Sequence, residues 1–424
     1  MKINFKKVFK NKFIRNIIIV ASGTAIAQII AFILTPVITR IYGPDAFGGL
    51  GTFQAIINIL GPIAALTYPI AIVLPTENYK AKDIMKLSLI ICLGIGVLSG
   101  LVLMFAFDFI VELFNLQFIA PFLYLIPLIV IFSGGVQIIE QWLIRTKQFR
   151  VTAKTAVSQS ILVNSSKVGV GLIYPFTVSL ILLQTLGIAL RGVLMIISSD
   201  RSIFKKENLK GTTNLIKTAR DYRDFPMYRS PQVFFNSVSQ GLPTILLASF
   251  FGPASAGFYS LGTLAMGTPV QLVGKAVQDV FYPRISEAAN RKENIRKIII
   301  KSLLGLILIG IIPFGTIIVF GPEIFTLIFG KQWTEAGVYT QWIALMSFFM
   351  LITRPIIVSI PVLQIQKQFL FYEVAGTIAK VVALVIGFFY FNSDIFAVAL
   401  YSITGTTLYI ILTYYTLSVA KRYN

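Results

Sequence analysis

Residues 252–257 of this chain are Gly-Pro-Ala-Ser-Ala-Gly, and residues 43–48 are Gly-Pro-Asp-Ala-Phe-Gly. Each phrase follows one long apolar segment and precedes another. The two phrases begin 209 residues apart in a chain of 424 residues, so the offset is close to half the chain. A phrase repeated in this way between apolar segments is typical of a duplicated membrane bundle, and many transporters consist of two such halves.

A second repeated phrase supports the duplication. Residues 108–115 are Asp-Phe-Ile-Val-Glu-Leu-Phe-Asn and residues 323–330 are Glu-Ile-Phe-Thr-Leu-Ile-Phe-Gly, at an offset of 215 residues. Both lie where we expect the connection between the third and fourth helices of a half. Because six helices per half is an even number, both halves start on the same side of the membrane. This predicts parallel repeats related by a pseudo-twofold axis along the membrane normal.

The composition indicates an all-α, polytopic membrane protein. Hydrophobic residues make up 56% of the chain and charged residues 13%, and the mean hydropathy is +0.81. Soluble domains hold about 25% charged residues, so that class is excluded. Apolar segments of bilayer-spanning length predict about 12 transmembrane helices in two six-helix lobes. We expect these helices at residues 16–38, 47–73, 85–107, 119–144, 152–173, 177–198, 231–251, 256–282, 299–320, 336–360, 369–391 and 395–418.

The distribution of charge predicts the topology. The net charge is +20, and with the N-terminus inside, 30 of the 37 lysines and arginines fall in cytoplasmic segments. Two, Arg40 and Lys331, fall in outer segments. This asymmetry follows the positive-inside rule, so we expect both termini in the cytoplasm. The excess charge is then expected to contact anionic membrane lipid rather than nucleic acid.

The repeat also predicts the domain organisation. We expect an N-terminal six-helix lobe at residues 1–198, a cytoplasmic linker at residues 199–230 and a C-terminal six-helix lobe at residues 231–424. Within the linker, residues 215–226 mix apolar and aromatic side chains with charges. Two interpretations of this segment stay open: an amphipathic helix on the inner leaflet or a solvated tether.

The residue types that are missing exclude several functions. The chain has no histidine and a single cysteine, Cys92. An intramolecular disulfide is therefore excluded, and the most common zinc ligand is absent. No arrangement typical of hydrolysis is present, so we predict no catalytic residues, no bound metal, no cofactor and no enzyme activity.

Five basic residues fall inside the predicted spans, where an ionised side chain is costly and usually faces a bundle interior or a wet cavity. They are Lys167, Arg191, Lys275, Arg354 and Lys380. Lys167 and Lys380 lie about 10 Å or more from the predicted ends of their helices, which makes reaching the membrane surface difficult. For the other three, a long side chain that extends to the inner interface is an equal alternative.

Polar residues recur at helical spacing on several predicted spans, and these stripes indicate either a lumen or seams of interhelical hydrogen bonds. The amides that we select from them are Gln28, Gln54, Asn58, Asn236 and Gln271. Three carboxylates, Glu140, Asp279 and Glu373, lie near Arg145, Lys275 and Lys380 respectively. Each is either a counter-ion for that neighbour or a site for a coupling proton or sodium ion.

Several short motifs together resemble a known family. They are Ala-Arg-Asp-Tyr-Arg-Asp-Phe-Pro-Met-Tyr at 219–228, Phe-Gly-Pro at 251–253, Gly-Phe-Tyr at 257–259, Val-Phe-Tyr-Pro-Arg at 280–284, Arg-Ile-Tyr-Gly-Pro at 40–44, Glu-Gln-Trp-Leu-Ile-Arg at 140–145 and Leu-Ile-Phe-Gly at 327–330. In this order the chain resembles the polysaccharide transporter branch of the multidrug/oligosaccharidyl-lipid/polysaccharide flippase superfamily. The branch includes flippases for O-antigen and capsule repeat units, and the likeness extends from Ile14 to Leu417.

The resemblance implies a function. It implies a protein of the bacterial inner membrane that moves undecaprenyl-pyrophosphate-linked oligosaccharide to the outer leaflet by alternating access through a central lumen. A proton or sodium gradient, or the membrane potential, would drive this movement, and a polysaccharide polymerase and a chain-length regulator would be further partners.

With this substrate, the basic and amide residues receive separate roles. The five basic residues are expected to bind the pyrophosphate, because lysine and arginine balance phosphate charge. The five amides are expected to bind sugar hydroxyls.

Two other functions are weighed against the flippase. A multidrug or cation exporter of the same superfamily would need an acidic lumen, whereas the predicted lumen is basic. A membrane polysaccharide polymerase or glycosyltransferase often carries a large outer loop with catalytic residues, whereas the outer connections expected here are short.

Overall fold

In the computed structural model, residues 12–200, 214–291 and 293–422 are described, and every regular element in these ranges is helical. The basic residues of the predicted cytoplasmic N-terminus before Lys12, and linker residues 201–213, lie outside this range. Ten helices in the described part are long and apolar enough to cross a membrane. Two further long helices, α7 (Phe149–Gly171) and α11 (Pro253–Asn290), contain more polar residues. The prediction of an all-α chain with about 12 long helices is confirmed.

By its contacts the chain forms two compact units, residues 1–249 and 250–424, which are described separately. The first unit contains α2 (Lys12–Ile41), α3 (Pro44–Leu60), α4 (Asn78–Leu113), α6 (Ile126–Arg145), α7, α8 (Thr177–Ser198) and most of α10 (Ser230–Phe251). The second contains α11, α12 (Ile295–Phe329), α13 (Thr334–Ile352), α14 (Arg354–Ser359), α15 (Gln366–Phe391) and α16 (Asp394–Arg422). The predicted lobes divide at the linker 199–230, whereas the compact units divide after residue 249. Two sequence repeats need not coincide with two packing units, so the lobes stay a prediction.

The repeated Gly-Pro phrases are helix starts. Gly43 precedes α3 in an extended conformation, and Pro44 occupies the first turn, where its missing N–H costs nothing. In the second phrase Gly252 has φ of 89°, a value that favours glycine, and Pro253 begins α11. The phrase therefore ends one membrane helix and begins the next.

The backbone repeats its irregularities in the two halves. α4 has a kink at Ala106 and α12 has one at Phe320, both just before the second repeated phrase. These phrases end in residues with positive φ, Asn115 and Gly330. The connections that follow α6 and α14 contain a further such pair, Lys147 and Gln364. The offsets of 214, 215 and 217 residues agree with those of the sequence phrases, which supports the duplication.

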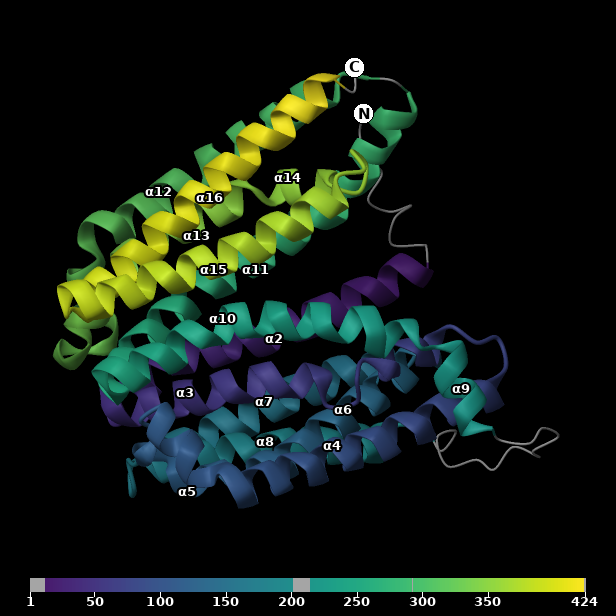
Figure 1. The fold of residues 1–424 in the computed structure, drawn as a ribbon, viewed down its shortest axis with the longest axis horizontal. Helices are drawn as coiled ribbons and strands as arrows, with labels where there is room; N and C mark the ends of the chain where they lie inside the picture. The colour runs from purple at the N-terminus through teal and green to yellow at the C-terminus, as the bar shows by residue number, and fades with distance from the viewer. Residues whose placement is uncertain (1–11, 201–213, 292, 423–424) are drawn as a thin grey trace. The chain divides into compact units, whose positions relative to one another are not determined.

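In the first unit, α2 packs along α7, α4 packs along α6, and α8 packs against α6 and α7. These helices lie side by side in Figure 1. Cys92 of α4 is fully buried, and a side chain at Gly134 of α6 would clash with its sulfur. The thiol therefore fills a close helix contact, in agreement with the apolar segment that surrounds it.

The predicted span 47–73 is wrong as a single helix. α3 ends at Leu60, and 3₁₀ turns cover Gly61–Ile63 (η1) and Tyr68–Val73 (η2), separated by Leu66 and Thr67 at φ of 47° and 57°. Pro62 and Pro69 lack the N–H groups that would continue the helix. The carbonyl of Gly61, at the break, accepts from the Ala64 N–H at 3.1 Å and from Gln137 Nε2 on α6 at 2.6 Å.

In the second unit, α13 packs on α11, α12 and α16, and α15 packs on α16. Figure 1 shows α12, α13, α15 and α16 running alongside one another. Gly337 of α13 lies so close to Gly321 and Pro322 of α12 that a side chain there would clash with backbone. The predicted span 336–360 is divided into α13 and α14 at Thr353, because Pro355 follows two residues later.

Candidate functional site: cations within the helical bundles

Lys167 lies inside the first unit, with 7% of its surface exposed. It belongs to α7, which packs between α2 and α8. Its ammonium donates a 2.8 Å hydrogen bond to Gln184 Oε1 on α8, and Tyr42, the residue after α2, donates to the Lys167 carbonyl at 2.9 Å. Among the described residues no carboxylate forms an ion pair with Lys167. The charge is therefore held by a neutral amide.

Lys167 shares one face of α7 with Ser160 and Asn164, and the three residues form one of the predicted polar stripes. Ser160, on the same face of α7 two turns before Lys167, donates to the carbonyl of Ala27 on α2 at 2.7 Å. Asn164 donates to the Ser160 carbonyl at 2.7 Å. The Ser160 bond forms a seam between α2 and α7, which was the alternative interpretation of the stripe, whereas the Asn164 bond lies within α7. Hydrogen bonding between helices needs only polar residues, so it does not account for the charge of Lys167.

Lys380 lies on α15 in the second unit and is partly buried. Its ammonium is 5.6 Å from the centre of the Tyr401 ring on α16, a cation–π distance. Tyr401 in turn contacts the buried ring of Tyr259 edge to face. Glu373, two turns before Lys380 on α15, acts on the lysine electrostatically but forms no ion pair with it in the described structure.

Lys167 and Lys380 are 213 residues apart, within the range of the repeat offsets. Each lies on the fifth long helix of its half, and each contacts the sixth through a neutral group, an amide on α8 or an aromatic face on α16. The duplication therefore places a lysine inside each unit at a corresponding position. The backbone irregularities repeat at 214 to 217 residues, so the two lysines lie at similar positions in the two halves, within about one helical turn.

Arg191 of α8 pairs with Glu140 of α6 at 3.4 Å, with both side chains about 30% exposed or less. Glu140 is thus a counter-ion, one of its two predicted roles, but its partner in the structure is Arg191 and not Arg145. Arg145, one turn beyond Glu140, turns away toward the start of α4. The carboxylate instead meets a base on the neighbouring helix α8, a contact between helices that sequence spacing does not show.

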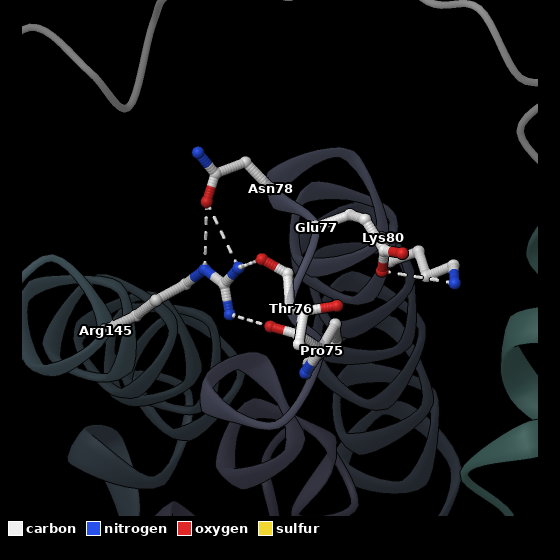
Figure 2. A network of polar contacts seen from close by, with 6 residues as sticks. All are labelled: Pro75, Thr76, Glu77, Asn78, Lys80 and Arg145. Atoms are coloured by element: carbon white, nitrogen blue, oxygen red, sulfur yellow. Dashed lines mark hydrogen bonds and ion pairs between the residues drawn. The ribbon is translucent and has the colours of Figure 1, made fainter.

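Figure 2 shows where Arg145 is bound. Its guanidinium donates five hydrogen bonds: to the carbonyls of Ile72, Pro75 and Thr76, and twice to Asn78 Oδ1, at 2.5 to 3.3 Å. All five N–H groups of an arginine are used. An open hollow lined by Pro75, Thr76 and Arg145 therefore has no free donor on its arginine, and we assign Arg145 a structural role.

The remaining cations lie in different settings. Arg354 begins α14 and packs against Gly274 of α11, and its buried Nε has no hydrogen-bond partner in the described residues. Lys275, the next residue on α11, is exposed, as is Asp279 one turn later. No ion pair joins Lys275 to Asp279 in the part of the chain that the structure describes.

The predicted amides divide between paired and exposed groups. Gln54 donates to Asn58 at 2.8 Å on α3, and Gln240 donates to Asn236 at 2.7 Å on α10. Gln28 and Gln271 are exposed. No cluster of three metal-ligating side chains is found among the described residues.

Sequence reasoning missed residues whose role depends on contacts between helices. Gln137, which caps the broken helix, and Tyr401, which faces Lys380, were not selected. Their signals in the sequence were one amide and one tyrosine among the polar and aromatic residues of apolar helices. Such residues gain meaning only when the packing partner is known.

The fold is similar to that of solved membrane transporters. It matches the lipid II flippase MurJ in an inward closed conformation with a TM-score of 0.70 at 14% identity, over 96% of this chain and 90% of that one. It matches an inward-facing multidrug resistance MATE family transporter of the MOP superfamily with a TM-score of 0.66 at 12% identity, over 93% and 96%. A MOP superfamily transporter from Pyrococcus furiosus, whose structure is described by a reversed polarity of its binding pocket, matches at 0.52 and 15% identity, over 96% of each chain.

These likenesses and the ten apolar helices in the described part of the chain show a multi-pass membrane protein whose fold is that of MOP superfamily transporters. A family model described as polysaccharide biosynthesis protein matches residues 37–338, more than half of the chain. The chain belongs to this polysaccharide biosynthesis protein family, and the predicted resemblance is confirmed. A comparison with curated protein sequences finds no match.

Proposed function

We propose that this protein is a flippase that moves an undecaprenyl-pyrophosphate-linked oligosaccharide repeat unit across the bacterial inner membrane by alternating access. Family membership and fold support a transporter of polysaccharide biosynthesis. The lipid-linked substrate is supported by the fold shared with a protein named as a lipid II flippase. O-antigen and capsule units are the substrate classes that the sequence resemblance implies.

The observation that carries the proposal is Lys167. A buried cation without a carboxylate is costly to keep in a membrane protein, and such residues usually serve function. The ammonium has three N–H donors, and its one described hydrogen bond goes to Gln184. A phosphate oxygen would supply both the missing charge and further acceptors. Lys380 offers a second cation at the corresponding position of the other unit.

The other candidate residues take graded roles in this proposal. Arg191 forms an ion pair with Glu140, so it contributes less to the anion site unless that pair opens. Lys275 and Arg354 remain candidates for the pyrophosphate, and the five amides Gln28, Gln54, Asn58, Asn236 and Gln271 for the glycan. Glu140, Asp279 and Glu373 remain coupling candidates, with Glu373 favoured because it lies partly buried on the same helix as Lys380.

A reconstituted transport assay tests the function. Purified protein is placed in proteoliposomes with a fluorescent undecaprenyl-pyrophosphate oligosaccharide, and an impermeant quencher reports how much label reaches the other leaflet. We expect protein-dependent flipping, and competition by undecaprenyl pyrophosphate but not by undecaprenol. The same vesicles are tested with a cationic dye, the substrate type of the exporter alternative. Dye movement without lipid movement would overturn the proposal in favour of an exporter.

A further inference from the structure

The described end of the linker is docked on the first unit. It forms α9 (Leu215–Asp221), capped by Asn214 whose Oδ1 accepts from the Lys217 N–H at 2.9 Å, and then a π-helical turn at Phe225–Arg229 (η5) that leads directly into α10. Figure 1 shows α9 as a short helix set at an angle to the long helices of its unit. The segment is therefore helical in part, as one of the two sequence interpretations held.

Two hydrogen bonds and an apolar contact fix this segment. Tyr68 Oη donates to the carbonyl of Ala219, and Thr67 Oγ1 donates to the carbonyl of Phe225, each at 3.1 Å. Tyr222 and Phe225 pack on a cluster of buried residues from η2, α4 and α6. That cluster consists of Ala71, Ile72, Ala81, Ile84, Ile138 and Trp142. Docking thus uses one side of the segment.

The opposite side carries a regular pattern. Ile216, Arg220, Arg223 and Met227 follow 4, 3, 4 spacing and are all exposed, Ile216 by 78% and Met227 by 62%. We call these four residues the outer stripe. Ile216 and Arg220 lie one turn apart on the same face of α9. Arg223 follows in the turn after α9 and Met227 lies in η5, and the carboxylates Asp221 and Asp224 between them are also exposed. The stripe therefore presents large apolar side chains and guanidinium groups together.

The level of the segment on the molecule indicates what the stripe meets. It rests on the first turns of α4 and the last turns of α6, both candidate membrane spans, and its η5 turn opens a third candidate span, Phe225–Phe251. At the same level Lys82 stands 5.7 Å from the centre of the Trp142 ring. Tryptophan and lysine at helix ends are typical of the membrane interface.

We infer that the outer stripe binds anionic phospholipid headgroups, with Arg220 and Arg223 on the phosphates and Ile216 and Met227 at the boundary of the acyl chains. Exposed cations beside exposed apolar side chains match the chemistry of that interface, whereas a water-soluble anion would use the cations alone. The linker would then be held from both sides, by protein and by lipid. This inference rests on the membrane fold and not on the proposed substrate.

The test uses a probe in the stripe. A Cys92→Ser, Ile216→Cys variant is labelled with an environment-sensitive fluorophore and placed in nanodiscs of phosphatidylcholine, with or without phosphatidylglycerol. We expect a blue shift of the emission with phosphatidylglycerol, and its reversal at high salt. Adding Arg220→Gln and Arg223→Gln to the probe variant should abolish the shift.

Three controls separate the possible results. Lys331→Gln in the probe variant removes an exposed cation on the connection between α12 and α13, and it should leave the shift intact. Inorganic phosphate added to phosphatidylcholine nanodiscs should cause no shift, since a free anion does not bring acyl chains. Equal emission in both lipids, or a shift that survives loss of both arginines, would overturn the inference. Size-exclusion elution unchanged from the parent confirms that the variants are folded.

Discussion

At the scale of single residues, the free energy needed to bury the Lys167 ammonium is the most informative quantity. A buried ammonium held by one amide loses much of its hydration free energy, and its contacts with the described residues replace little of that loss. Replacing such a group by an apolar side chain of similar length is often neutral or stabilising. Stability and function should therefore respond to this side chain in opposite directions.

We predict that Lys167→Met raises the free energy of unfolding by about 1–3 kcal/mol and lowers flipping at least tenfold. Lys167→Arg should retain part of the transport because the charge remains. Thermal unfolding in detergent and the proteoliposome assay measure the two effects. Lys86→Met, an exposed lysine at a salt bridge with Asp83, is the control and should leave transport unchanged. Normal flipping by Lys167→Met would remove Lys167 from the anion site.

Arg145 should behave in the opposite way, because its five hydrogen bonds hold the start of α4 against the end of η2. Hydrogen bonds to charged groups contribute about 1.5–3 kcal/mol each, without adding fully. We predict that Arg145→Ala lowers the free energy of unfolding by about 2–4 kcal/mol, and that lysine restores less than half of this. Thermal unfolding measures the loss, and the exposed Arg150→Ala serves as control. Equal stability of the two variants would contradict the structural role.

At the scale of elements, the joint between α11 and α12 is tied by an exposed ion pair of Arg284 and Glu293. The hydrogen bond from Arg284 is the largest cause that lowers the pKa of Glu293 below its ordinary value of 4.5. A carboxylate with a lowered folded-state pKa stabilises the fold above its unfolded pKa, and this contribution is lost as pH falls through the folded pKa.

We therefore predict that Glu293→Gln lowers the unfolding temperature slightly at neutral pH and has no effect once the pH is well below the folded-state pKa of Glu293. The effect is small because surface ion pairs contribute little. Unfolding temperatures measured across the acid range check this, with the exposed Glu335→Gln as control. A difference from wild type that grows toward acid pH would have the wrong sign.

The elements also show which parts of the structure can be predicted from the sequence. Long apolar helices were placed well, and α8 was predicted with its observed bounds of 177–198. The break after Leu60 was missed because the segment stays apolar through Val73, and hydropathy does not record a lost backbone bond. The candidate cations were found because charge in an apolar span is conspicuous. Their partners, Gln184 and Tyr401, were fixed only by packing between helices.

At the scale of the whole molecule, the partition of charge makes a prediction about topology. Both termini and the linker should be cytoplasmic, because 30 basic residues fall on that side and two on the other. Single cysteines in the Cys92→Ser background, at Asn214 and at Lys331, should label with an impermeant reagent from opposite sides of the membrane. Labelling of Asn214→Cys from outside would reverse the orientation and with it the direction proposed for transport.

The burial of Cys92 makes its thiol a reporter of how often the contact between α4 and α6 opens. Its sulfur is sealed between α4 and α6 against Gly134, and no other thiol exists in the sequence to compete with it. A thiol reagent can react only when these two helices part, so the rate of modification of the unaltered protein counts opening events in the first unit. If substrate or a gradient changes how often those helices separate, the reaction rate will show it without any label or substitution.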